Sequence, residues 1–272
     1  MINQDFIFSS ESVTEGHPDK VADQISDAVL DAIIKDDPSC RVACETLITR
    51  NKVILSAEIK STVSVDYKKI VKDTLLAIGY NEDSTGFNAN TCDIDLYIEE
   101  QSPDISMGVD QKGTGIIGAG DQGLMFGYAT NENDNLMPYP ILLAHKLTKD
   151  LALKRKDGSL PFLMPDGKSQ VSIKYEDNKA KYVDTVLIST QHSENVDDST
   201  LKESIIEEII KKQIPYDLIN SKTKFLINPT GRFVVGGPQG DTGLTGRKII
   251  VDTYGGWAKH GGGAFSGKDP SK

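Results

Sequence analysis

The order of secondary structure is decided by residues 18–60, which read PDKVADQISDAVLDAIIKDDPSCRVACETLITRNKVILSAEIK. From Pro18 to about Lys35, apolar residues recur every three or four positions, the pattern of an amphipathic helix. Two runs rich in β-branched residues follow at 41–49 and 52–60. This stretch therefore predicts one helix followed by two strands.

The rest of the chain continues this alternation. The further predicted elements are a helix near 65–78, strands near 93–98 and at 124–128, a helix at 140–154, strands at 170–175 and 182–190, a helix at 199–212, and strands at 224–227 and 248–253. Because the order starts again at residues 124 and 248, we expect repeated α+β units. Their sheets are expected to be antiparallel or mixed, with helices on one face.

The repeats predict four segments. They are an N-terminal α+β unit at 1–103, an active-site loop or linker at 104–123, a central α+β unit at 124–233, and the start of a C-terminal unit at 234–272. If the three units are equal in length, roughly a hundred residues of the third are absent, so we expect a truncated chain.

Composition limits the kinds of partner. With 40 acidic and 30 basic residues the formal net charge is -10, which opposes nucleic acid and anionic membrane surfaces. Residues 236–272 reverse this balance locally, because they hold five Lys or Arg against three Asp, with 11 of the 24 glycines. We expect a local anion site there. Three cysteines without metal-type spacing, and no signal peptide or membrane span, predict a cytoplasmic protein with reduced thiols.

Residues 261–272, GGGAFSGKDPSK, have most of a phosphate-binding loop. Gly262, Gly267 and Lys268 have its spacing, in which backbone amides surround phosphate oxygens and the ammonium group neutralises them. Asp269, however, stands where a phosphate-loop NTPase has a Ser or Thr for magnesium. The segment therefore predicts polyphosphate binding of another kind.

Two other glycine-containing stretches give different predictions. Residues 236–248 hold five glycines beside Asp241, Arg247 and Lys248, and a loop of this kind loses much conformational entropy unless its backbone approaches a ligand. Residues 113–118, GTGIIG, match a dinucleotide-binding fingerprint, but no strand is predicted before them. We expect a long loop there that covers an active site.

The start of the first helix has two interpretations. His17 lies where free amides favour an anion, and Asp19 could hold a divalent cation on it. Ser12 and Glu15 have the spacing of a capping box, and Pro18 suits a first turn. In the simpler interpretation, the acidic residues of this helix form a solvated row: Asp19, Asp23, Asp27 and Asp31.

Other polar residues are ambiguous when taken alone. Glu45 and Glu58 lie in predicted strands, and each is either exposed or an inward carboxylate for a cation or an amino group. Residues 166–168, Asp-Gly-Lys after Pro165, predict a plain turn. Gly231 and Arg232 follow the turn-like residues 228–230.

Taken together, these segments resemble the S-adenosylmethionine synthetases. The motifs that carry the resemblance are SESVTEGHPDKVADQISDAVLD at 10–31, QSPDI at 101–105, GAGDQGLMFGYATNE at 118–132, NPTGR at 228–232, and the segments 240–256 and 260–272. The resemblance implies three similar units around a pseudo-threefold axis, with active sites between the subunits of a homodimer or homotetramer. It implies that methionine is joined to ATP and that the tripolyphosphate is hydrolysed.

The resemblance also implies roles for individual residues. The implied ATP site consists of His17, Asp166, Lys168, Arg232, Phe233, Asp241, Arg247, Lys248, Ala264 and Lys268. The implied methionine site consists of Glu58, Gln101, Asp241 and Lys272, and the implied metal ligands are Asp19 for Mg2+ and Glu45 for K+. We expect four of these residues to be catalytic: His17, Lys168, Arg247 and Lys268. Asp121 is expected to have a secondary role, and the loop at 101–111 to close over the site.

Two other functions remain open at this point. One is a non-catalytic module of the same fold that binds nucleotide or dimerises, which the missing part of the third unit would permit. The other is a phosphate-loop kinase or NTPase, which Asp269 and the lack of a predicted helix at Lys268 disfavour.

Overall fold

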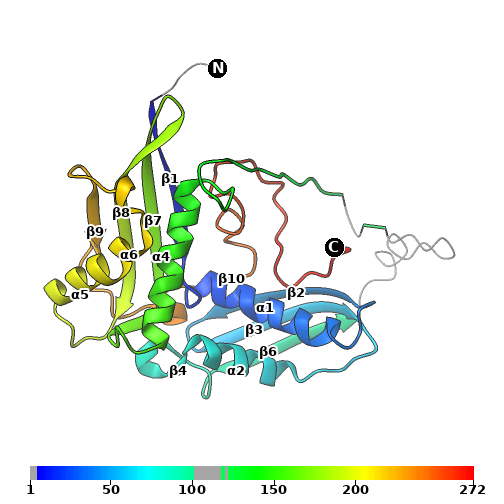
Figure 1. Cartoon of the computed structure of the whole chain (residues 1–272). Coiled ribbons are helices and arrows are strands. Elements are labelled where there is room, and N and C mark those ends of the chain that lie inside the picture. Colours follow the sequence, from blue (N-terminus) through cyan, green and yellow to red (C-terminus); the bar gives the residue numbers. More distant parts are fainter. Residues whose placement is uncertain (1–4, 101–117, 120–121) are drawn as a thin grey trace. The chain divides into compact units, whose positions relative to one another are not determined.

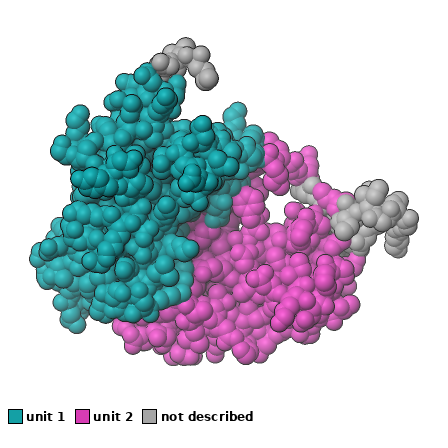
Figure 2. Space-filling model, viewed as in Figure 1, with its two compact units in different colours: residues 1–17, 126–236, 250–260 teal, residues 18–125, 237–249, 261–272 magenta. Residues whose placement is uncertain are grey.

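The computed structural model describes residues 5–100, 118–119 and 122–272. The chain divides into two compact units, each made of three separate segments (Figure 2). Unit 1 comprises residues 1–17, 126–236 and 250–260, and unit 2 comprises residues 18–125, 237–249 and 261–272. Gln101, Asp121, the fingerprint at 113–118 and the loop at 101–111 fall wholly or largely outside the described residues.

Unit 2 is built on a four-stranded sheet in the order β10-β2-β3-β6 (Figure 1). Its strands are β2 (Arg41–Thr49), β3 (Lys52–Lys60), β6 (Asp93–Glu100) and β10 (Gly243–Leu244). β3 pairs antiparallel with β2 and parallel with β6. The other elements are α1 (Pro18–Ile34), α2 (Tyr67–Ile78), the hairpin of β4 (Asn81–Glu82) and β5 (Phe87–Asn88), and two 3-10 turns, η1 (Asp83–Thr85) and η4 (Gly237–Gln239).

The core of unit 2 follows from the two periodicities in residues 18–60. The apolar stripe of α1, including Ile25 and Ile33, is fully buried in one cluster with the inward side chains of β2 and β3, such as Val42 and Leu55. Alternation leaves the opposite face of these strands more open, and Glu45 and Glu58 are exposed there. Neither glutamate therefore enters the core of this unit, and a role for either toward a cation or an amino group stays a prediction.

Unit 1 contains the second sheet, in the order β1-β7-β8-β9. Its strands are β1 (Phe6–Val13), β7 (Leu163–Glu176), β8 (Lys179–His192) and β9 (Lys224–Ile227). Its helical elements are α4 (Tyr139–Lys156), α5 (Asp198–Ile205), the π-helical η2 (Ile206–Ile210), α6 (Lys211–Gln213) and the 3-10 turn η3 (Tyr216–Leu218). Trp257 packs on Phe6, Phe8 and Tyr175 at the edge of this unit's core.

The predicted α+β class with mixed and antiparallel sheets is confirmed, and four local predictions are wrong. Residues 124–128 and 248–253 form no strand, because a short apolar run does not by itself provide a pairing partner. Residues 166–168 lie inside β7 rather than in a turn. Ser12 is not a helix cap, because it lies in β1 and its hydroxyl hydrogen-bonds His145 Nδ1 at 2.8 Å.

Candidate functional site

Asp19 is the centre of a charged cluster in unit 2. It lies in the first turn of α1 and is 3% exposed. Lys248 Nζ lies 2.6 Å from its Oδ2, and Arg247 Nε lies 3.8 Å from its Oδ1. The backbone N–H of Leu244 donates to the same Oδ1 at 3.0 Å. The structure thus brings together the predicted magnesium ligand and two predicted ATP-binding cations.

Gly243 explains how the chain comes so close to α1. A Cβ atom at this position would lie 2.0 Å from the carbonyl oxygen of Pro18, a distance that no real side chain tolerates. The absence of a side chain therefore lets β10 lie against the first turn of the helix, and Lys248 follows a few residues later. The glycine-rich stretch predicted a close approach of backbone to a ligand, and at Gly243 the close approach is to α1.

The acidic row of α1 is not a solvated surface, so the simpler interpretation of it is wrong for three of its four members. Asp23 is 2% exposed, and its Oδ1 accepts the N–H of Gly246 at 2.8 Å. Asp27 is partly buried, and its Oδ1 accepts the N–H of Gly267 at 2.8 Å. Asp31 alone in this row is exposed. The row faces the two glycine-rich segments, whose amides need acceptors when buried.

Burial raises the pKa of Asp27 above its ordinary value, and the nearby Asp23 and Asp31 act in the same direction. The N–H of Gly267 opposes this shift because it stabilises the carboxylate. Periodicity had identified the acidic row, but it could not indicate that glycine amides distant in sequence would be its partners.

Lys268 is held beside β2, on the open face of the sheet. Its Nζ lies 2.5 Å from Glu45 Oε1 and 3.4 Å from the carbonyl oxygen of Cys44. Its side chain is 12% exposed although that of Glu45 is 56% exposed. Residues 267–269 run along the edge of β2, where Cys44 N–H donates to Gly267 O at 2.9 Å. A third predicted ATP-binding cation therefore pairs with the predicted potassium ligand.

Asp269 has a structural task. Its Oδ2 accepts the N–H of Val42 at 2.8 Å, and its own N–H donates to Val42 O at 3.1 Å. The segment around Lys268 forms an isolated bridge to Ala43 rather than the start of a helix. This arrangement disagrees with a phosphate-loop NTPase, in which a helix begins at the lysine.

The other predicted residues of unit 2 lie at its surface. Glu58 faces Ala43 across the β2/β3 pair and is exposed, as are Asp241 and Lys272. Asp241 accepts the N–H of Thr242 at 2.8 Å. Ala264 lies against Gly246, because a Cβ atom added at Gly246 would lie 2.5 Å from the Cβ of Ala264.

In unit 1, Gln191 joins two predicted ATP-binding segments. It is fully buried in β8, its Oε1 accepts the N–H of Asp166 at 3.3 Å, and its Nε2 donates to Val234 O at 3.0 Å. Next to it, Phe233 N–H donates to His192 Nε2 at 3.1 Å. Sequence reasoning missed Gln191. A polar residue ending an alternating strand was the only available signal.

The three remaining predicted residues of unit 1 are less closely connected. Lys168 Nζ lies 3.9 Å from Glu11 Oε2, and Arg232 forms an exposed ion pair with Glu194 at 2.5 Å. His17 ends the first segment of unit 1, and its N–H donates to Thr14 O at 3.1 Å.

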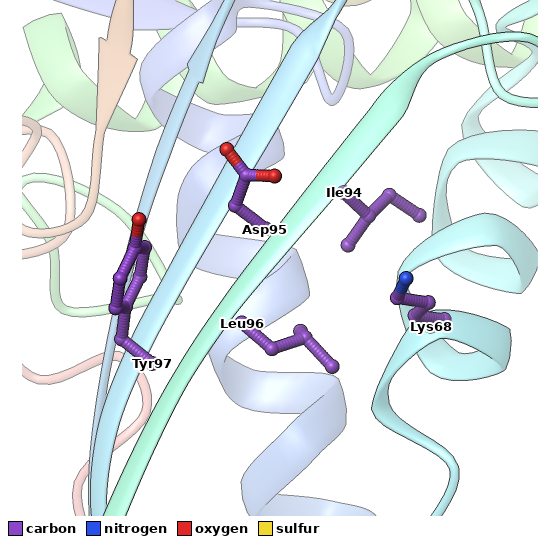
Figure 3. A pocket seen from close by; sticks show the side chains of 5 residues that line it. All are labelled: Lys68, Ile94, Asp95, Leu96 and Tyr97. Carbon is purple, nitrogen blue, oxygen red and sulfur yellow. The ribbon is translucent and has the colours of Figure 1, made fainter.

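A shallow hollow lies elsewhere in unit 2 and contains none of the predicted site residues. It is lined by Lys68 of α2 and by residues 94–97 of β6. Figure 3 shows Asp95 and Tyr97 on one side of β6, and Ile94 and Leu96 on the side of Lys68. Asp95 pairs with Lys52 at 2.8 Å. This hollow is therefore separate from the candidate site.

Among the residues that the structure describes, no group of three or more His, Cys, Asp or Glu side chains could hold a metal ion. Within the same part of the chain, no helix is long and apolar enough to cross a bilayer.

Known proteins match nearly all of this chain but are longer than it. Residues 5–103, 116–233 and 235–272 match the family models of the N-terminal, central and C-terminal domains of S-adenosylmethionine synthetase. The S-adenosylmethionine synthase of Clostridium tetani is 57% identical over 98% of this chain and 70% of its own length. That of Helicobacter hepaticus is 57% identical over 100% and 70%, and that of Desulfosudis oleivorans 59% over 98% and 69%. The chain thus spans about 70% of these relatives.

Proposed function

The chain belongs to the S-adenosylmethionine synthetase family, and we propose that the residues described above carry out that family's reaction. The methionine sulfur attacks C5′ of ATP, S-adenosylmethionine forms, and the released tripolyphosphate is hydrolysed to pyrophosphate and phosphate. ATP and L-methionine are therefore the substrates. The alternative, a non-catalytic nucleotide-binding module, is not favoured by 57–59% identity to synthases.

Charge explains which residues the reaction needs. The methionine sulfur is a neutral nucleophile and requires no general base, so the barrier lies in expelling a highly charged tripolyphosphate. We assign its neutralisation to Lys248 and Arg247 beside Asp19, and to Lys268 beside Glu45. His17 and Lys168 are proposed to act with them.

The remaining assignments concern substrate binding. Asp166, Arg232, Phe233, Asp241 and Ala264 are proposed to complete the ATP site. Glu58, Gln101, Asp241 and Lys272 are proposed to hold methionine. The buried bridge through Gln191 supports the first set, because it ties the backbones of Asp166 and Val234 to one strand.

Enzymes of this family use metal ions, and we assign magnesium to Asp19 and potassium to Glu45. Both side chains offer oxygen ligands, which hard cations take, and one carboxylate fits magnesium that is also bound by phosphates. When bound, magnesium would offset negative charge on the phosphates. Within the protein, Lys248 holds the Asp19 carboxylate at 2.6 Å and so fixes its orientation.

The Asp19–Lys248 pair is the observation that carries this proposal, and Lys248→Met tests it. Phosphate and pyrophosphate release from ATP is measured with and without methionine, in Mg2+ and K+, on protein of verified intact mass. We expect methionine-dependent release by the unaltered chain and about 100-fold lower kcat for Lys248→Met. Lys35→Met, an exposed lysine just after α1, is the control. ATP binding by the unaltered chain without either product would refute the proposal.

The assembly proposed from the family is a homodimer or homotetramer with active sites between subunits, in the cytoplasm. The division into units at 1–103, 124–233 and 234–272, and their pseudo-threefold arrangement, stay predictions. Sedimentation equilibrium of the purified chain would give its oligomeric state, and a monomer at all concentrations would contradict shared active sites.

A further inference from the structure

Lys268 lies between two residues whose backbones are anchored to different elements. On its N-terminal side, the N–H of Gly267 donates to Asp27 of α1 at 2.8 Å. On its C-terminal side, Asp269 accepts the N–H of Val42 in β2 at 2.8 Å. The backbone on either side of Lys268 is therefore held by a carboxylate, one from the helix and one from its own segment.

Gly267 is packed closely against the backbone of β2. Its φ of +73° favours glycine, and a Cβ would lie 2.5 Å from Cys44 O. Its carbonyl meanwhile accepts the N–H of Cys44 at 2.9 Å. Both polar groups of this peptide are thus satisfied, and only the donor that faces α1 depends on an ionisable side chain.

Asp269 is anchored just as firmly. It is 3% exposed, and its Oδ1 accepts both the hydroxyl and the N–H of Ser271, at 2.6 and 3.0 Å. With Oδ2 on Val42, the whole carboxylate is used to shape the chain after Lys268.

We propose that Asp27 and Asp269 are positioning residues that fix Lys268 for the polyphosphate of the substrate. Lysine has a flexible four-carbon side chain, so its ammonium is accurately placed only if its backbone is. This inference rests on the proposed function, because that function assigns Lys268 to the polyphosphate. It adds two aspartates that do not touch the substrate but act through the lysine.

A parallel contact supports the same design at the other cationic segment. Asp23, one turn before Asp27, accepts the N–H of Gly246, which directly precedes Arg247. In both places a carboxylate of α1 binds the amide of a glycine with positive φ immediately before a predicted phosphate ligand. Burial disfavours the charged form of Asp27, and the hydrogen bond from the N–H of Gly267 opposes this effect because it stabilises the carboxylate.

The test uses tripolyphosphate as the probe and compares single and double variants of the full chain. Calorimetry with Mg2+ present measures its dissociation constant for Asp27→Ala, Asp27→Asn, Asp31→Ala and Lys268→Met, and for the double variant Asp27→Ala with Lys268→Met. Asp31 is the matched control because it lies one turn further along the same helix and is exposed.

If Asp27 acted only through its charge, removing it would change tripolyphosphate affinity in the opposite direction from that expected of a positioning residue. Removing an acidic residue from an acidic protein should tighten anion binding slightly, and Asp31→Ala should do so. We expect Asp27→Ala instead to weaken tripolyphosphate binding about tenfold, and Asp27→Asn, which keeps the acceptor oxygen, to stay within about twofold of the unaltered chain. In the Lys268→Met background, Asp27→Ala should have little further effect. Asp269→Asn should weaken tripolyphosphate binding, because one of its two accepting oxygens becomes an NH2 group that cannot accept from Val42 or Ser271.

Each contrary result has one meaning. If Lys268→Met alone leaves tripolyphosphate affinity unchanged, the role assigned to Lys268 in the proposed function is wrong. If Lys268→Met weakens binding but Asp27→Ala does not, only the positioning role is wrong. Equal losses from Asp27→Ala with and without Lys268 would also overturn it, because the aspartate would then act on general stability.

Discussion

Replacing Gly267 by alanine should detach the segment that carries Lys268. Two effects combine at this residue: its φ is +73°, and a new Cβ would lie 2.5 Å from Cys44 O and 2.7 Å from Ser26 Cβ. The first costs about 1–3 kcal/mol for a residue other than glycine. The second is overpacking against backbone, which costs a further 1–3 kcal/mol or so. The sum is about 2–6 kcal/mol.

The hydrogen bonds that hold this segment against α1 and β2 contribute a free energy similar to the cost of the substitution. Apart from the contacts of the Lys268 ammonium group, Gly267 and Asp269 provide four hydrogen bonds to α1 and β2: Gly267 to Asp27 and Cys44, and Asp269 twice to Val42. At a net contribution of about 0.5–1.5 kcal/mol each, they supply about 2–6 kcal/mol. The substitution therefore roughly cancels docking, and the segment should be released while the core of unit 2 stays folded.

Two neighbouring glycines separate the two effects. Gly262 has φ +96° but nothing within 4 Å of its Cβ position, and Gly263 has neither a positive φ nor a close neighbour. Hydrogen exchange of residues 261–272 and of the β2 edge is compared in the three alanine variants. We expect the fastest exchange for Gly267→Ala, an intermediate rate for Gly262→Ala, and an unchanged rate for Gly263→Ala. Equal rates for Gly267→Ala and Gly263→Ala would refute the close packing on which this reasoning depends.

Three further predictions concern stability and reactivity. Hydrogen bonds hold the pKa of Asp37 well below its usual range, so its stabilising effect is present above the unfolded-state pKa and is lost as the pH falls. The difference in urea midpoint between Asp37→Ala and the unaltered chain should therefore narrow below about pH 4, and a constant difference would contradict this. Burial raises the pKa of Cys44 to about 12, and all three cysteines are buried, so a thiol reagent at pH 8 should label them only after unfolding. Asn228→Ala loses two hydrogen bonds to Thr190, at 2.8 and 3.0 Å. It should lower the free energy of unfolding by about 2–4 kcal/mol, measured by urea unfolding followed through Trp257 fluorescence. A decrease below about 0.5 kcal/mol would contradict this prediction.

Local patterns predicted the regular elements well where they were long. The helix expected from Pro18 to about Lys35 is α1, and the strands at 41–49 and 52–60 coincide with β2 and β3. Runs of four to six residues were less informative: 224–227 is a strand, but 124–128 and 248–253 are not. Short apolar runs acquire a structure only from the partner that they meet.

The candidate site likewise contains residues that the sequence identified and residues that only their folded partners identify. Motif resemblance identified Asp19, Lys248 and Lys268 as residues of interest, and the structure pairs the two lysines with carboxylates, Asp19 and Glu45. No pattern in the sequence indicated that Gln191 joins two segments. Its role arises from hydrogen bonds to backbone groups, which any residue type can offer.

Local periodicity, motifs and composition were enough to predict the α+β class, the family and the glycine-rich cationic character of residues 236–272. That the acidic row of α1 is an anchor rather than a solvated surface became visible only in the folded chain. Asp23 and Asp27 are separated from Gly246 and Gly267 by more than two hundred residues of chain. Their contacts exist because burying backbone amides of the C-terminal segments against α1 requires acceptors, and that requirement is invisible until the chain is folded.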